Sequence, residues 1–261
     1  MQIWVDYLKI IELIEKGVSL IESEKDKKIG IYYPSEASRC VRQAYYSYFE
    51  KPHYDIETHK AFSIGNALHA LVQNALELNK DYEVKNEVPS LVYKDKVANL
   101  EIHGRLDSIV KDKKTGKLDL IEIKSIANPK YAPIKEHYEQ LNYYLYFYKE
   151  ADGHLLYINK SKKTNFDEDY VTFKEIPNSK QDSIKYDEAL FQALLKRIRI
   201  LHEYLTMKKL PYPEAKLSSD MYWACGYCPY RQKCDREENE NIIGKKEYAE
   251  IAKKYEQVVG D

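Results

Sequence analysis

The spacing of hydrophobic and polar positions divides the chain into helical and extended segments. Apolar residues three to four positions apart predict helices over residues 4–21, 58–78, 133–149, 185–209 and 245–258. A further helix is predicted to begin at Pro34–Ser35, with Ser38 as a second candidate cap, and to carry Cys40. Shorter segments rich in β-branched and aromatic residues predict strands over residues 83–93, 99–110, 118–124, 155–159 and 170–176. This mixture predicts an α/β fold with a central sheet flanked by helices.

Composition and charge add few constraints to this picture. The 261 residues include 41 basic and 42 acidic side chains. No linker or repeat divides the sequence into two folding units, so we expect a single domain over residues 1–261. No run of about 18 apolar residues occurs, and the start of the chain lacks the layout of a secretion signal. We therefore expect a cytoplasmic protein with no membrane partner. A net charge of −1 means that binding to nucleic acid would need a local basic patch.

The segment GRLDSIV–KDKKTGK–LDLIEIKS predicts a β-hairpin whose turn is the polar stretch in the middle. If the chain folds back between residues 114 and 115, antiparallel partners have numbers that sum to 229. Asp107 then faces Glu122 across the hairpin. Because side chains alternate along a strand, Lys124 shares the face of Glu122, whereas Ile121 and Ile123 point into a core.

Two acids and a lysine on one face suit metal-assisted hydrolysis of a phosphodiester. Carboxylates held this close repel each other unless a cation lies between them, which favours Mg²⁺ or Mn²⁺. A lysine beside such an ion can orient a water molecule or stabilise negative charge on a phosphate. Spacing alone does not establish such a site, because cross-strand acid–lysine pairs are common in an ordinary solvated hairpin, and on spacing alone that interpretation is favoured.

An Asp on one strand and Glu-x-Lys on the next resemble the signature of the PD-(D/E)XK nuclease superfamily. Asp107 and Glu122-Ile123-Lys124 match it, with Leu106 where a proline is expected, as is common in the RecB-like branch. The segment GNALHALVQ resembles that branch's Gly-x-x-x-His helix, and HYEQLNYYLYF resembles its Gln-centred helix. A strand residue before the hairpin, Glu87, is a candidate for an additional acid at the site.

The resemblance implies a PD-(D/E)XK restriction-endonuclease-like core over residues 58–180. It implies Mn²⁺ or Mg²⁺ held by His69, Asp107, Glu122 and the backbone carbonyl of Ile123. It also implies a catalytic set that consists of Asp107, Glu122, Lys124, Gln140 and Tyr144. Gln140 and Tyr144 lie four residues apart and so share one helix face. Arg39, Arg42 and Arg105 are the candidates for contacts with DNA phosphates.

Four cysteines carry a second signal: Cys40 is isolated, whereas Cys225, Cys228 and Cys234 have the spacing C-x2-C-x5-C. In a protein expected inside a cell, such thiols argue for a metal rather than disulfides, with an iron–sulfur cluster, zinc and free thiols as the alternatives. The one-plus-three layout and the segment SEASRCVRQAYYSYF resemble the RecB-like iron–sulfur nucleases. That resemblance implies a [4Fe–4S] cluster that clasps residues 35–50 and 211–240 together.

The resemblance covers residues 35–234 and fits best the stand-alone CRISPR-associated RecB-like nucleases, the fourth Cas family, and their viral and archaeal relatives. It implies a DNA exonuclease that acts on single-stranded or overhanging ends, with 5′ to 3′ polarity favoured, in CRISPR spacer acquisition or viral DNA metabolism. The sequence has no Walker A loop, so ATP-driven unwinding is not expected. We expect Asp107→Ala or Lys124→Ala to abolish cleavage.

A rival interpretation is a DNA-binding adaptor subunit of an integrase or helicase complex, with cleavage secondary. The intact set of two acids and a lysine favours the enzyme. A redox or zinc-binding regulator would explain the cysteines but not the hairpin.

Overall fold

The computed structural model describes residues 12–13, 15–18, 27–126, 134–159, 173–175, 183–219, 221–237 and 244–255. Its strands are β1 (Ile31–Tyr32), β2 (Tyr82–Asp95), β3 (Leu100–Asp112), β4 (Leu118–Ile126), β5 (Asp152–Asn159) and β6 (Phe173–Glu175). Its longer helices are α4 (Ile56–Glu77), α5 (Lys135–Phe147), α6 (Glu188–Met207) and α9 (Gly244–Lys254). Its shorter helices are α2 (Pro34–Ala37), α3 (Val41–Tyr46), α7 (Glu214–Leu217), η2 (Tyr222–Tyr227) and α8 (Arg231–Arg236).

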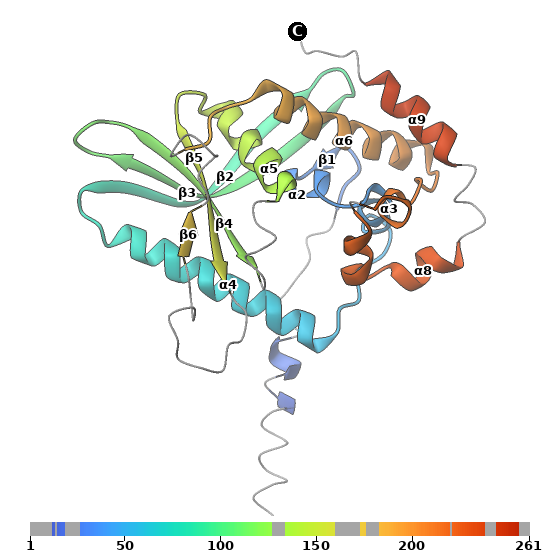
Figure 1. The fold of residues 1–261 in the computed structure, drawn as a ribbon, viewed down its shortest axis with the longest axis horizontal. Coiled ribbons are helices and arrows are strands. Elements are labelled where there is room, and N and C mark those ends of the chain that lie inside the picture. Colours follow the sequence, from blue (N-terminus) through green and yellow to red (C-terminus); the bar gives the residue numbers. More distant parts are fainter. Residues whose placement is uncertain are drawn as a thin grey trace, which may run out of the picture.

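The predicted α/β architecture is confirmed. The strands form one mixed sheet in the order β1-β3-β4-β5-β6. Strand β1 and strand β4 pair with one edge of β3, and β2 pairs with the other edge of β3. Figure 1 shows α4 along one face of this sheet and α5 and α6 on the opposite face. Each predicted strand and long helix agrees with an observed element to within a few residues, as far as the residues are described. Residues 12–13 and 15–18 of the first predicted helix are helical, and the rest of that prediction lies outside the described residues.

The register predicted for the hairpin is also confirmed. Strands β3 and β4 are antiparallel with Ser108 opposite Ile121, Ile109 opposite Leu120 and Val110 opposite Asp119, and each pair of numbers sums to 229. The turn is short and contains Gly116 at φ +75°, a backbone conformation that suits glycine. Strand β5 then runs parallel to β4, which requires a crossover, and α5 lies within it.

Two hydrophobic cores hold the helices on the sheet. On one face, Val72 of α4 packs with Ile123 and Ile158, and Ile121 lies against this cluster, as the alternation along β4 predicts. On the other face, α5 and α6 bury the larger cluster, with Leu120 of β4 among its members. Because β4 is covered on both sides, its polar residues Glu122 and Lys124 lie between helices rather than on an open surface.

The predicted helix that carries Cys40 is wrong in one respect, because it is divided in two. Helix α2 ends at Ala37, and α3 begins at Val41 with Cys40 at its N-cap position and Ser38 outside it. The backbone N–H of Val41 donates instead to Glu214 Oε1 at 2.9 Å. This cap comes from a residue 173 positions away in the sequence, so a local pattern could not predict it. Strand β1 and the short helices α7, η2 and α8 were not predicted either.

No helix among the residues that the structure describes is both long and apolar enough to cross a membrane.

Substitution of Gly104 by alanine is expected to destabilise the fold by about 1–3 kcal/mol, because the added methyl group overpacks the core. A Cβ at Gly104 would lie 2.7 Å from Cε1 of Tyr144 and closer still to the ring of Tyr143. Thermal unfolding measures the effect. Gly17→Ala is the matched control, since no atom of the described residues lies within 4 Å of a Cβ there. An unchanged melting temperature for Gly104→Ala would contradict this account of the packing.

Candidate active site

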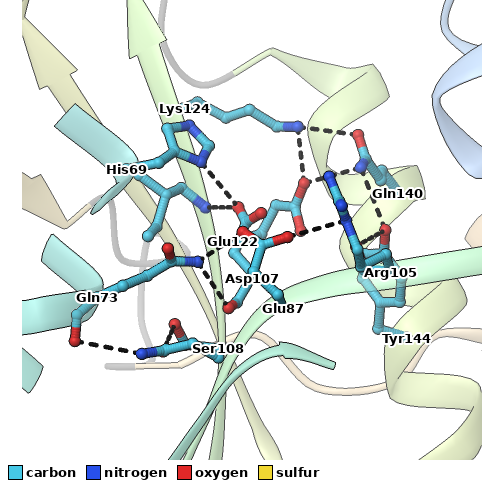
Figure 2. A network of polar contacts seen from close by, with 12 residues as sticks. His69, Gln73, Glu87, Arg105, Asp107, Ser108, Glu122, Lys124, Gln140 and Tyr144 are labelled. Carbon is cyan, nitrogen blue, oxygen red and sulfur yellow. Dashed lines mark hydrogen bonds and ion pairs between the residues drawn. The ribbon is translucent and has the colours of Figure 1, made fainter. Parts of the chain in front are cut away.

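The two predicted acids lie where the hairpin ladder ends. Beyond the Ser108–Ile121 pair, the Asp107 side chain replaces backbone pairing, because its Oδ2 accepts the backbone N–H of Ile123 at 2.7 Å. This hydrogen bond fixes the Asp107 carboxylate beside the strand that carries Glu122. The arrangement agrees with the predicted juxtaposition of the two acids (Figure 2).

Glu122 is buried and is tied to a lysine and a glutamine. Only 3% of the residue is exposed. Its Oε1 accepts from Lys124 Nζ at 2.7 Å and from Gln140 Nε2 at 2.7 Å, and Lys124 Nζ also donates to Gln140 Oε1 at 2.9 Å. The three side chains therefore form a closed ring of hydrogen bonds (Figure 2). Both the amide orientation of Gln140 and the position of the Lys124 ammonium group follow from it.

The second carboxylate oxygen of Glu122, Oε2, is buried and has no hydrogen-bond partner among the residues that the structure describes. A buried acceptor without a partner is unfavourable, so this atom points to a missing donor or cation. Burial first, and then the nearby charge of Asp107, raise the pKa of the Glu122 carboxyl group above its ordinary value. A divalent cation would remove both penalties, since it coordinates oxygen and offsets the repulsion between the acids.

Helix α4 adds two side chains, one turn apart, that are directed at Asp107. His69 Nδ1 lies 3.7 Å from Asp107 Oδ2, within reach of an ion that both could share. Gln73, which the sequence analysis did not select, donates to the backbone carbonyl of Asp107 at 3.0 Å and to Glu87 Oε1 at 2.8 Å. The four-residue spacing of His69 and Gln73 was the signal that could have identified it.

Helix α5 covers the site from the other side. Gln140 Nε2 lies 3.4 Å from the hydroxyl oxygen of Tyr144, and that hydroxyl donates to the carbonyl of Arg105 at 2.9 Å. The structure thus brings together all the predicted catalytic and metal-binding residues: His69, Asp107, Glu122, Ile123, Lys124, Gln140 and Tyr144.

Glu87 and Arg105 lie at the rim of the site. The pairing of β2 with β3 shifts register between Val88 and Leu91, and Glu87 adopts a left-handed conformation beside this bulge, with φ +49°. There its Oε2 lies 2.9 Å from Arg105 Nε. Arg105, Arg39 and Lys124 all line one open pocket with Asp107 and Glu122. This pocket combines acids with cations that suit phosphate groups.

The prediction that Arg42 contacts DNA phosphate is corrected by the structure. Arg42 is only 1% exposed and lies outside this pocket. Its Nε donates to the carbonyl of Pro211 at 2.6 Å, and its Nη1 lies 3.8 Å from Cys234 Sγ. A phosphate cannot reach a guanidinium group that is enclosed in this way.

The four cysteines line a single cavity: Cys40 at the N-cap of α3, Cys225 in η2, Cys228 at the C-cap of η2, and Cys234 in α8. Burial, together with the other thiols of the cavity, raises the pKa of Cys228 to about 11. In the part of the chain that the structure describes, no group of three or more His, Cys, Asp or Glu side chains has the arrangement of a metal site. Four thiols around one cavity are nevertheless the donor set that zinc and iron–sulfur clusters use.

We expect His137 of α5 to make the fold sensitive to mild acid. Burial, and then the charge of Lys124, lower the pKa of His137 to about 3, and its Nδ1 lies 2.8 Å from the Tyr157 hydroxyl oxygen. An unfolded histidine has a pKa of about 6.5, so between these values the unfolded state binds more protons and stability falls as the pH falls. Urea unfolding should show a loss of about 1–2 kcal/mol between pH 7 and pH 5. His137→Gln should lack this contribution, and an unchanged pH slope in that variant would contradict the assignment.

Comparisons with known proteins agree with this geometry. A family model described as the PD-(D/E)XK nuclease superfamily matches residues 75–235, which include Asp107, Glu122, Lys124 and Gln140 but not His69. The chain is 23% identical over 218 residues to the CRISPR-associated exonuclease Cas4 of Saccharolobus solfataricus, a match that covers 80% of this chain and 89% of that protein. It is also similar to the crystal structure of SSO0001, with a TM-score of 0.54, 25% identity, and coverage of 85% of this chain and 94% of that one. The α/β fold, with a central mixed sheet flanked by helices, fits the fold of this superfamily.

Proposed function

This chain belongs to the PD-(D/E)XK nuclease superfamily, and from that premise we propose that it is a metal-dependent DNA exonuclease. It would degrade single-stranded or overhanging ends, with 5′ to 3′ polarity favoured. The observation that carries the proposal is the buried Oε2 of Glu122 beside Asp107 and Lys124. This oxygen has no hydrogen-bond partner in the described part of the chain, and a divalent cation would satisfy it. The similarity to a relative named as an exonuclease supports the exonuclease activity.

His69, Asp107, Glu122 and the backbone carbonyl of Ile123 would hold one or two Mn²⁺ or Mg²⁺ ions. Such an ion would supply Lewis acidity and stabilise the charge that develops on the phosphate. The imidazole in this set favours Mn²⁺ somewhat over Mg²⁺, because nitrogen is a softer donor than carboxylate oxygen.

The side chains around the ion would bind the phosphate and orient the attacking water. Lys124 Nζ is held by Glu122 and Gln140, so it would position or activate that water without searching through rotamers. Arg39 and Arg105 would contact neighbouring phosphates from the wall and rim of the pocket.

The four cysteines would hold a [4Fe–4S] cluster with a structural role. Their common cavity and their one-plus-three spacing support a cluster rather than two local zinc pairs. The cluster would clasp residues 35–50 to residues 211–240, beside a catalytic core over residues 58–180 of one domain. Its loss would loosen both segments together.

We place the activity in CRISPR spacer acquisition or viral DNA metabolism, where the enzyme would trim DNA ends beside an integrase or helicase. The support is the name of the Saccharolobus solfataricus relative, a CRISPR-associated exonuclease.

The test is degradation of single-stranded DNA labelled at its 5′ or 3′ end, in Mn²⁺, by protein purified without oxygen. The wild type should release label and Asp107→Ala should not, and a comparison of the two labels gives the polarity. If neither protein cuts but both bind DNA, the enzyme proposal fails and the adaptor function takes its place.

A further inference from the structure

Arg42 is a buried positive charge for which the proposed DNA site has no use. Its guanidinium group lies on the wall of the cavity that the four cysteines line, with Nη1 3.8 Å from Cys234 Sγ. Its Nε is fixed by the carbonyl of Pro211 at 2.6 Å. Helix α3, which carries Arg42, lies beside the orange segment that leads to α8 in Figure 1. The side chain is therefore held so that one edge faces the sulfur atoms.

This charge has no carboxylate partner within the described ranges. Acids of the surrounding segments are engaged by other groups: Glu214 pairs with Arg197 at 2.6 Å, and Glu237 accepts a hydrogen bond from the Tyr46 hydroxyl. Asp235, which lines the same cavity, pairs with Lys216 at 3.0 Å. A buried guanidinium group without a counter-charge is strongly unfavourable, and proteins do not normally leave one unpaired. The cavity in front of Arg42 therefore requires an anion.

We propose that Arg42 is the counter-charge of an anionic thiolate cluster in this cavity. The inference rests on the proposed [4Fe–4S] group and adds a positioning residue to it. Four cysteine thiolates around the iron–sulfur core carry net negative charge, and that charge grows when the cluster is reduced. Arg42 stabilises the loaded cavity through this charge and through its hydrogen bond to the Cys234 sulfur.

An arginine suits this position because its guanidinium group donates in two directions at once. One direction is the carbonyl of Pro211, before α7, and the other is Cys234 in α8. Loading of the cluster is thereby coupled to the order of the segment that leads from α6 to α8. Groups around a metal site that act through its ligands typically change metal retention by about 10–100-fold.

The experiment measures the iron and sulfide content and the rate of iron release to a chelator in protein purified without oxygen. Arg42→Met should release iron at least about tenfold faster than the wild type, whereas Arg42→Lys, which keeps the charge but not the two-way donation, should release iron more slowly than Arg42→Met. The midpoint potential of the cluster, titrated with dithionite, should shift to more negative values in Arg42→Met. Arg39→Met is the matched control, since it removes an arginine charge three positions away that faces the DNA pocket, and it should leave both quantities unchanged.

Each outcome separates this inference from the proposed function. A wild-type protein that contains neither iron nor sulfide overturns the proposed cluster and, with it, this role of Arg42. A loaded wild type with unchanged iron release in Arg42→Met overturns the role of Arg42 alone. Equal acceleration in the Met and Lys variants also overturns it, because the bond to Pro211 rather than the charge would then matter. If Arg42→Met does not fold, Arg42→Gln removes the charge while keeping a donor, and the same comparison applies.

Discussion

Replacement of Lys124 by methionine is expected to lower the rate of DNA cleavage by about a thousandfold while leaving DNA binding and the fold intact. A positioned group that transfers or orients a proton contributes about 10²–10⁴ to a rate, and Lys124 is the only cation in hydrogen-bond contact with Glu122 in the described part of the chain. Methionine keeps an unbranched apolar side chain of similar length but removes the ammonium group. Cleavage of end-labelled single-stranded DNA in Mn²⁺ measures the rate, and DNA binding is measured in a chelator so that no cleavage intervenes.

Lys135→Met provides the matched control for this experiment. Lys135 starts helix α5, is exposed, and pairs with Glu139 rather than with the site. Its replacement should leave the rate within about twofold of the wild type, because the exposed Lys135 ammonium group contacts Glu139 and lies outside the hydrogen-bonded set around Glu122. A Lys124→Met enzyme that retains activity within about tenfold of the wild type would remove Lys124 from the catalytic set.

The sequence could predict this site because two local periodicities, one along a strand and one along a helix, fix its geometry. A short turn fixes the hairpin register, and the alternation of side chains along β4 then places Glu122 and Lys124 on one face and Ile123 on the other. The four-residue spacing on α5 places Gln140 and Tyr144 together in the same way. Each of these relations spans fewer than about twenty residues, so the geometry of one or two elements decides it.

Contacts between distant segments could not be predicted in this way. Arginine is usually found at the surface, yet Arg42 is enclosed by Pro211 and Cys234. These two residues lie 169 and 192 positions away in the sequence. Glu87 reaches Gln73 and Arg105 only because β2 bulges beside it, and nothing local in its segment specifies that bulge. These side chains depend on how three or more elements pack, which the hydrophobic pattern constrains only loosely.

The same distinction explains the second large effect that we expect, which concerns stability. Arg199→Met should lower the free energy of unfolding by about 3–5 kcal/mol, because it removes one partner of a buried ion pair. Arg199 Nε of α6 lies 2.6 Å from Asp95 Oδ2 at the end of β2, and the two side chains are only 2% and 1% exposed. The other oxygen of Asp95 accepts the backbone N–H groups of Val97 and Ala98, so this carboxylate also shapes the turn into β3.

Denaturant unfolding of Asp95→Asn, the Arg199→Met/Asp95→Asn double variant and Lys254→Met tests this account. In the Arg199→Met/Asp95→Asn double variant, the buried charge is gone while an amide oxygen can still accept from the turn. Its loss of stability should therefore be smaller than the sum of the two single losses, a coupling that is expected for residues in contact. Lys254→Met is the control, since Lys254 of α9 and Glu203 of α6 form a more exposed pair at 2.9 Å, and its removal should cost less than about 1 kcal/mol. Equal losses for Arg199→Met and Lys254→Met would show that burial does not set the strength of these pairs, and the link from β2 to α6 would then be one of packing alone.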